Sequence, residues 1–277
     1  MPVSMTALLD DLAAESALLR DVLAGLDEAT WRRATPAAGW TIADQISHLA
    51  YFDDVALRSA TDPSAFDAEK EAMDADGGVD PDAIAARFRD LSGAEMLAWF
   101  DEARSRLIAG FRDVEPGQRV PWFGPPMSAA SSVTARIMET WAHGQDVYDA
   151  AGAEHPPSPR LRHVAHIGVG ARPFSYAAHA REMPVTPIRV ELTAPDGSTW
   201  SWGPEDAADR ITGPAIDFAL LITQRRHRDD LALTIVGDAA TEWAEIGQAF
   251  AGKAGAGRAP LRDGAPWSST SETGGVR

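Results

Sequence analysis

Cysteine is absent from the 277-residue chain. Its absence excludes disulfide bonds, metal sites built from thiolates and a cysteine nucleophile. Any thiol that takes part in chemistry here must therefore come from another molecule. The lack of disulfides also fits a cytoplasmic protein, which is the location we expect.

Positive charge is scarce, with 25 lysines and arginines against 41 aspartates and glutamates and a net charge of −16. A surface this acidic repels phosphate groups, so we expect no nucleic-acid partner and no docking on anionic membranes. No apolar run approaches the roughly 18 residues that a membrane span needs. The N-terminal stretch MPVSMTALLDDLAAES lacks the basic and apolar segments of a signal peptide. We therefore expect small molecules as partners, and a monomer or homodimer.

The first half of the chain has the periodicity of long helices. Apolar residues recur at helical spacing over 8–26. Thr41 and Ser92 each stand three residues before an acid and begin a helix as capping boxes. A fourth helix is expected from near Ser128 to a stop at Gly152. Four helices of this length predict a four-helix bundle.

Residues 62–82 carry eight acids against the single lysine Lys70. A calcium loop is one interpretation, but the acids lack the alternating register that such a loop requires. We favour a solvated connection or a lid.

The pattern changes after residue 152, where the proline-rich stretch HPPSPR marks a boundary. Residues 160–181 have helical character, and PIRVELTAPDGSTWSWG predicts a hairpin around Asp196-Gly197. We further expect a helix over 214–226, a strand over 231–237 and a helix over 240–251. The fold class is therefore α+β, a four-helix bundle followed by a small α+β domain. The predicted domains span 1–155 and 156–252, and we expect the Gly/Ser-rich tail 253–277 to be disordered.

Two pairs of polar residues suggest a metal site. Glu139 and His143 stand four residues apart on the fourth helix and so share one face, as do Asp44 and His48 on the second. Either pair alone is more typical of a solvent face or of a hydrogen-bonded core histidine. Two helices that each offer a histidine and a carboxylate favour a site between them. Two histidines and one carboxylate suit zinc with an open position, or ferrous iron.

Neighbouring residues have two interpretations each. Arg136, one turn before Glu139, would hold an anionic substrate group or form a surface pair with Glu139. Asp44 would accept the distal N–H of His48 in the second shell, join the coordination shell, or act only as the helix cap. Asp146 would serve as second shell or base, or be solvated. The loop 121–127 would form a wall of the pocket or a packed connector.

The second half offers weaker candidates. The basic stretch QRRHRDD (224–230) would receive an anion, although cations that complement a helix C-terminus are the simpler interpretation. His163 and His166 are spaced for a second ion but lack an accompanying carboxylate. Together with His179, they are better explained by packing or hydrogen bonds.

Two stretches resemble a known family. GWTIADQISHL (39–49) is similar to the second-helix motif of DinB-like metal-binding bundles, and METWAHGQDVYDA (138–150) is similar to their later E-x-x-x-H motif. The nearest resemblance is to the actinobacterial mycothiol-dependent maleylpyruvate isomerase family, over roughly residues 5–250. Within it, VPWFGPPMSAASSVTARIMETWAHGQDV and ITGPAIDFALLITQRRH resemble a subgroup known only as metal-binding proteins.

The resemblance implies a ligand set and a chemistry. It implies that His48, Glu139 and His143 bind the metal, with Zn²⁺ more often than Ni²⁺ or Fe²⁺. It also implies that the metal binds a low-molecular-weight thiol, such as mycothiol, and lowers its pKa for attack on a small electrophile. An isomerase would expel the thiol again and a transferase would keep the adduct. Two alternatives stay open, a non-catalytic metal- or ligand-binding module and a metal-dependent hydrolase or cyclase that uses bound water.

Overall fold

The computed structural model describes residues 4–261, which form two compact units that meet in sequence between His155 and Pro156. Each unit is described by itself below. Among the described residues, no helix combines the length and apolar character needed to cross a membrane.

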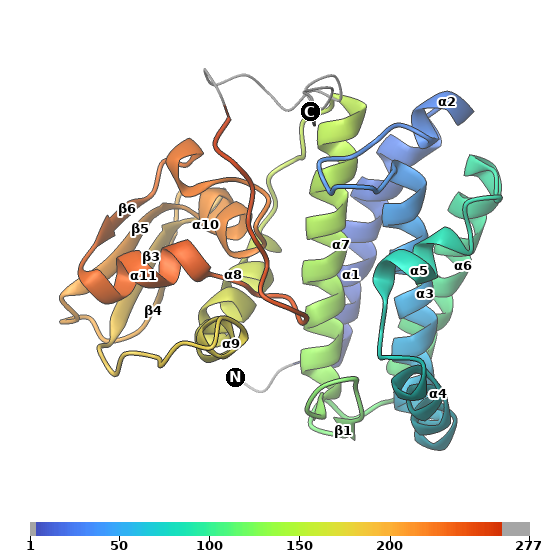
Figure 1. The fold of residues 1–277 in the computed structure, drawn as a ribbon, viewed down its shortest axis with the longest axis horizontal. Helices are drawn as coiled ribbons and strands as arrows, with labels where there is room; N and C mark the ends of the chain where they lie inside the picture. Colours follow the sequence, from blue (N-terminus) through green and yellow to red (C-terminus); the bar gives the residue numbers. More distant parts are fainter. Residues whose placement is uncertain (1–3, 262–277) are drawn as a thin grey trace, which may run out of the picture. The chain divides into compact units, whose positions relative to one another are not determined.

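Unit 1 is a helical bundle. Its long helices are α1 (Met5–Ala24), α3 (Ile42–Thr61), α6 (Gly93–Phe111) and α7 (Ala129–Ala151), which run alongside one another in Figure 1. α3 packs against both α6 and α7, and α1 packs against the same two helices. Shorter elements connect them: α2 (Glu28–Trp31), α4 (Pro63–Ala75), α5 (Pro81–Ala86) and the strand pair β1 (Arg119–Val120) and β2 (Met127–Ser128). The predicted four-helix bundle is confirmed.

The long helices begin where the sequence signals them. The capping boxes of Thr41 with Asp44 and of Ser92 with Glu95 are both formed. The side chain of Ser128 caps α7. At each of these helix starts, a side-chain oxygen therefore accepts from at least one of the four backbone N–H groups that have no partner within the helix. α7 ends as expected at Gly152, which adopts φ 70, a left-handed conformation that glycine takes without the steric cost of a Cβ.

Apolar faces hold the bundle together in two main clusters. One cluster joins α1, α3, α6 and the end of α7, and the other joins the start of α1, the end of α3, the end of α6 and the start of α7. Fully buried members include Leu12, Leu19, Ile42, Ile46, Leu49, Phe100, Leu107, Phe111, Val133 and Ile137. Each such side chain contributes about 1.5–3 kcal/mol through removal from water.

Residues 62–82 differ from the solvated connection that we expected. They form α4 and the start of α5, with Asp62 and Asp80 as the caps that precede Pro63 and Pro81. Proline suits the first position of a helix because its missing N–H would have no partner there. Most of the acids are exposed, but Phe66 on α4 is fully buried, and Glu69 accepts from Tyr51 and Arg58 of α3, so these residues anchor the segment to the bundle.

Unit 2 contains a four-stranded sheet in the order β4-β3-β5-β6. The strands are β3 (Ile188–Thr193), β4 (Thr199–Trp202), β5 (Asp209–Pro214) and β6 (Thr234–Val236). β3 and β4 form the predicted hairpin, with Gly197 at φ 80 in its turn. β5 runs parallel to β3 and was not predicted, because DRITGP is short and ends in Gly-Pro, which favours a turn over a strand.

The helices of unit 2 are α8 (Leu161–Gly170), α9 (Arg172–Ala178), α10 (Ala215–Ile222) and α11 (Asp238–Ile246), with a short 3₁₀ turn, η1 (Arg228–Asp230). The single helix expected over 160–181 is divided at Ala171. Residues 253–261 carry no helix or strand, although the backbone N–H of Gly255 donates to Gln248. The rest of the tail that we expected to be disordered, from residue 262, lies outside the described residues.

Candidate metal site

Three side chains from two helices of unit 1 converge in the structure. His48 comes from α3, while Glu139 and His143 lie one turn apart on α7, which packs against α3. His143 Nε2 lies 3.2 Å and His48 Nε2 lies 3.5 Å from the same oxygen, Oε2 of Glu139. One ligand atom from each residue lies within 4.8 Å of the others. We call these three residues the metal cluster.

The metal cluster is mostly shielded from solvent, with side-chain exposures of 12% for His48, 21% for Glu139 and 13% for His143. Burial lowers the pKa of His48 to about 4, helped by the nearby His143 and Arg136 and opposed by Glu139. Burial raises the pKa of Glu139, but the neighbouring imidazoles of His143 and His48 outweigh it and hold that pKa well below its usual range. At neutral pH, His48 is therefore neutral and Glu139 ionised, which are the states that bind a cation.

A hydrogen-bonded chain fixes the orientation of His143. The hydroxyl of Thr35 donates to the carbonyl of Trp40, so it accepts from Nε2 of Gln45. The amide of Gln45 therefore turns its Oε1 to Nδ1 of His143, which must carry the proton. Nε2 of His143 is left with its lone pair toward Glu139 and His48. Metal-binding histidines are held by such partners, so the geometry fits a metal.

Sequence reasoning missed Gln45. It lies in GWTIADQISHL, three residues before His48, and so shares a helix face with that histidine. That spacing of a second polar residue from His48 is the signal that would have identified it.

Asp44 does not contact His48. Its carboxylate accepts from the backbone N–H and hydroxyl of Thr41 and pairs with Arg89 at 2.9 Å. Nδ1 of His48 is buried and has no hydrogen-bond partner among the described residues. Asp44 therefore caps the helix and does not accept from His48, because a carboxylate at the third position of a helix turns back to the helix start.

Arg136 also has other partners than those expected. It is buried, with Nε donating to Asp53 at 3.0 Å and one terminal nitrogen donating to the carbonyl of Leu49. Arg104 of α6 binds the same carboxylate at 2.6 Å and also Thr140. From its place one turn before Glu139, the sequence left open a substrate-binding role or a surface pair with Glu139. Asp53 comes from another helix, and that distant acid draws the guanidinium inward.

Aromatic rings line two sides of the metal cluster. The ring of Trp40 stacks on His143 at 5.9 Å and lies 5.4 Å from His48, while Phe52 lies 4.6 Å from His48. Trp122 and Phe123 of the loop 121–127 lie within 6.4 Å of Phe52. The loop therefore backs the ring that touches His48, as a pocket wall would. These rings cover part of the cluster and leave its side chains 12–21% exposed.

The remaining candidates lie elsewhere. Asp146 on α7 is fully buried rather than solvated. In unit 2, Arg225 donates to the carbonyl of Thr223 just after α10, and His227 caps η1. His179 bonds the carbonyl of Ser175. Over residues 4–261, the metal cluster is the one group of three or more potential ligands close enough to hold an ion, so no second such group forms around His163 and His166.

Comparison with known proteins gives matches over most of the chain. The model of the mycothiol maleylpyruvate isomerase N-terminal domain matches residues 12–148, and that of wyosine base formation matches residues 184–235. Two uncharacterised proteins of Mycobacterium tuberculosis, from strains CDC 1551 and H37Rv, are each 47% identical over 248 residues, covering 90% of this chain and 96% of the relative.

Solved structures share the fold. Two crystal structures of mycothiol-dependent maleylpyruvate isomerase, one of them a mutant, align with TM-scores of 0.57 and 0.56 at 16% and 15% identity. Each alignment covers 84% of this chain and 93% of the solved chain. The DinB-like fold expected from the sequence, a helical bundle followed by a small α+β part, is confirmed.

Proposed function

We propose that this chain, which belongs to the mycothiol-dependent maleylpyruvate isomerase family, is an enzyme that uses a divalent metal to activate a low-molecular-weight thiol. The metal is bound by His48, Glu139 and His143, and zinc suits this donor set best, with nickel and ferrous iron as the other candidates. The thiol is mycothiol or a relative, and it attacks a small electrophile, which is isomerised or retained as an adduct. The domain limits of the proposal are 1–155 for the metal-binding bundle and 156–252 for the small domain.

The observation that carries the proposal is the convergence of the three ligand atoms within 4.8 Å. Two neutral imidazoles and one carboxylate are the donor set of hydrolytic and transferase zinc sites. Three protein ligands leave a tetrahedral ion with one free position. Asp44, the main candidate for a fourth ligand, is engaged by Thr41 and Arg89 instead.

Charge supports a thiolate in that free position. Arg104 and Arg136 carry two positive charges, and Asp53 and Glu139 carry two negative charges. Among these four side chains the charges cancel, so a divalent ion adds positive charge without a counterion. Bound zinc supplies Lewis acidity that lowers the pKa of a coordinated thiol or water.

The chain's own residues prepare the position. Gln45 holds the proton of His143 on Nδ1 and so keeps Nε2 available. Trp40 and Phe52 shield the two imidazoles, which strengthens every electrostatic interaction between them. Because the sequence contains no cysteine, the nucleophilic sulfur comes with a cosubstrate.

Cobalt substitution tests the proposal directly. The purified protein is expected to contain one metal ion per chain, and the cobalt form is expected to gain a thiolate charge-transfer band when mycothiol is added. S-methylated mycothiol is the matched control, because it keeps the shape and lacks the ionisable thiol. Incubation with maleylpyruvate and other cis-alkene acids then assays isomerisation and adduct formation.

The outcomes separate the alternatives. A band that saturates at one thiol per chain, with turnover of an electrophile, supports the proposal. Bound metal without a band for any thiol contradicts thiol activation and favours water-based chemistry or a non-catalytic role. Protein free of metal after purification and reconstitution contradicts the site itself.

A further inference from the structure

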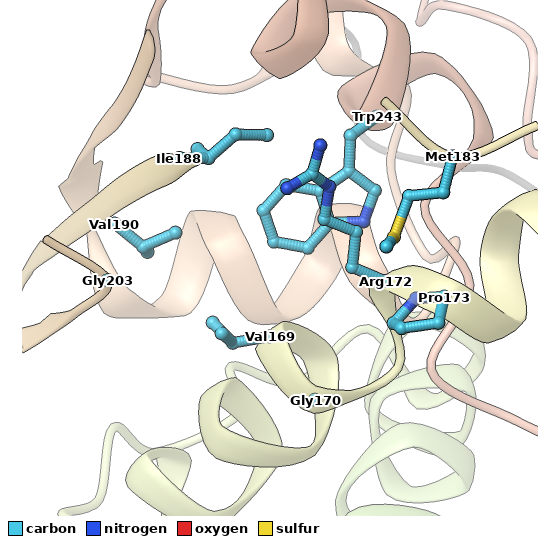
Figure 2. A pocket seen from close by; sticks show the side chains of 9 residues that line it. All are labelled: Val169, Gly170, Arg172, Pro173, Met183, Ile188, Val190, Gly203 and Trp243. Carbon is cyan, nitrogen blue, oxygen red and sulfur yellow. The ribbon is translucent and has the colours of Figure 1, made fainter. Parts of the chain in front are cut away.

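A cavity with a volume of about 310 Å³ lies within unit 2. It opens between the end of α8, the start of α9, strand β3 and helix α11. Figure 2 shows Ile188 and Val190 of β3 on one side and Met183 and Pro173 on the other, with Val169 beneath them. These five side chains are apolar, and the volume is at the lower end of the range for small-molecule sites.

Two polar groups enter this apolar lining, Arg172 and Trp243. The indole of Trp243 is 1% exposed, and its Nε1 has no hydrogen-bond partner among the described residues. Nε of Arg172 is also buried and lacks a partner within the same part of the chain. A buried N–H without an acceptor costs about 1–3 kcal/mol, so two in one cavity call for an acceptor from outside the chain.

Within residues 4–261, Arg172 forms no ion pair, and its guanidinium lies 5.9 Å from the centre of the Tyr176 ring. Its terminal nitrogens donate to the carbonyls of Thr186 and Pro184, at 3.0 and 3.2 Å, and carbonyls do not neutralise a guanidinium. No carboxylate lines the cavity. The nearby Glu242 accepts from Tyr176 and Arg181 at 3.3 Å each.

A purely structural role explains only part of this arrangement. The two carbonyl bonds tie the segment that carries Met183 to the start of α9, and they use the terminal nitrogens of Arg172. They leave Nε of Arg172 and Nε1 of Trp243 unexplained. Water would satisfy both N–H groups, but it would bring no negative charge to the partly buried guanidinium.

We propose that this cavity binds a small carboxylate with an apolar body. The carboxylate would accept from Arg172 and Trp243, and the apolar body would lie against Val169, Ile188 and Val190. Hydrogen bonds of this kind are charge-assisted and stronger than those between neutral groups. The site belongs to unit 2 and uses none of the residues of the metal cluster, so it stands independently of the proposed function.

Benzoate is the probe, and benzyl alcohol is its uncharged control. In a ¹⁵N-labelled full-length protein, the side-chain N–H signal of Trp243 is identified by its loss in Trp243→Phe, and that of Trp200 by its loss in Trp200→Phe. Benzoate is expected to shift the Trp243 signal saturably and to leave the Trp200 signal in place, because Trp200 does not line the cavity. Benzyl alcohol is expected to shift neither.

Affinity by calorimetry then tests the two donors. Trp243→Phe removes one N–H while keeping an aromatic ring, and it is expected to weaken benzoate binding about tenfold, as for a hydrogen bond to a charged group. Arg172→Met removes the charge and is expected to weaken it more. An unmoved Trp200 signal shows that each variant keeps the fold. Benzoate that causes no saturable shift, binding that survives in both variants, or equal binding of benzyl alcohol would overturn the proposal.

Discussion

The metal cluster and the cavity of unit 2 are built in opposite ways. Around the metal cluster, the chain itself pairs most polar groups: Arg104 and Arg136 share Asp53, and Gln45 accepts from His143. Nδ1 of His48 is the exception, with no partner among the described residues. In the cavity, Arg172 and Trp243 present donors for which the described chain offers no acceptor. The first region brings together three ligand atoms that suit a cation, and the second presents two donors that suit an anion.

The difference teaches how each region is recognised. Ligands of a metal converge on one point, and a second partner such as Gln45 on His143 orients them, so the convergence of three donors indicates an ion. An organic ligand brings its own acceptor, so buried donors without an acceptor indicate that kind of site.

Removal of a ligand has the largest effect. His143→Ala takes one of three donors from the metal cluster, and the metal content is expected to fall from one ion per chain to near zero. Elemental analysis of the purified variant measures this, and Arg172→Met serves as the control, with its metal content unchanged. Full metal content in His143→Ala would disprove the ligand assignment.

Loss of the shared carboxylate comes next. Asp53→Ala leaves the buried guanidiniums of Arg104 and Arg136 without their counterion, and a loss of about 3–5 kcal/mol in the free energy of unfolding is expected. Asp54→Ala is the matched control, because Asp54 pairs with the exposed Arg106 and such a pair contributes about 0–1 kcal/mol. Denaturant unfolding of both variants gives the comparison, and similar losses would show that the buried network has no special importance.

The depressed pKa of His48 makes the metal-free protein sensitive to acid. The unfolded chain takes up a proton on this residue near pH 6.5 and the folded chain only near pH 4, so the unfolded state binds more protons between these values. The stability that neutral His48 contributes is therefore fully present above about pH 6.5. It is lost as the pH drops toward 4, which lowers the free energy of unfolding by about 3 kcal/mol at most. Unfolding of the chelated protein across this range measures the slope. His48→Leu is expected to flatten it, and an unchanged slope would assign the effect to other groups.

Loss of the Gln45 amide, which orients His143, is expected to have a smaller effect. Gln45→Ala removes the acceptor for Nδ1 of His143, and metal affinity is expected to fall about 10–100-fold, as for other losses of a second partner. Competition with a chromophoric chelator measures the affinity. Gln45→Glu restores an acceptor and should recover most of it, whereas a structural role alone would leave both variants equally affected.

Removal of the metal has the smallest effect on the fold. The apolar clusters of unit 1 are complete without an ion, so the chelated protein is expected to keep its far-ultraviolet helical signal and only to melt at a lower temperature. Circular dichroism before and after chelation provides the test. A coil-like spectrum would mean that the bundle depends on its metal as a zinc finger does.

Local signals in the sequence predicted the bundle well. The capping boxes at Thr41 and Ser92 and the stop at Gly152 depend on residues a few positions apart, and all were found where expected. The pairing of His48 with the Glu139–His143 turn was suggested by spacing and by family resemblance. Local patterns failed where the position of a side chain depends on a residue far away in the sequence. Arg136 is the example, because its partner Asp53 is 83 positions away.

The cavity of unit 2 had no signal in the sequence. Its donors Arg172 and Trp243 are more than 70 residues apart and become neighbours only because α9 and α11 pack together. Strand β5, which runs parallel to β3, was missed for another reason, because DRITGP is short and ends in Gly-Pro. No periodicity or spacing connects such residues before the chain is folded.

Asp62 ends α3 and begins α4 with no residue between them. One residue inserted at this corner would turn α4 by about 100° around its axis. That rotation would take Phe66 away from Trp122, on which it stacks at 6.1 Å, and would release the loop behind Phe52. Evolution can therefore reshape this side of the metal cluster by exchanging side chains but not by lengthening the chain. Among relatives, we expect the length of this corner to be invariant while the aromatic residues around it vary.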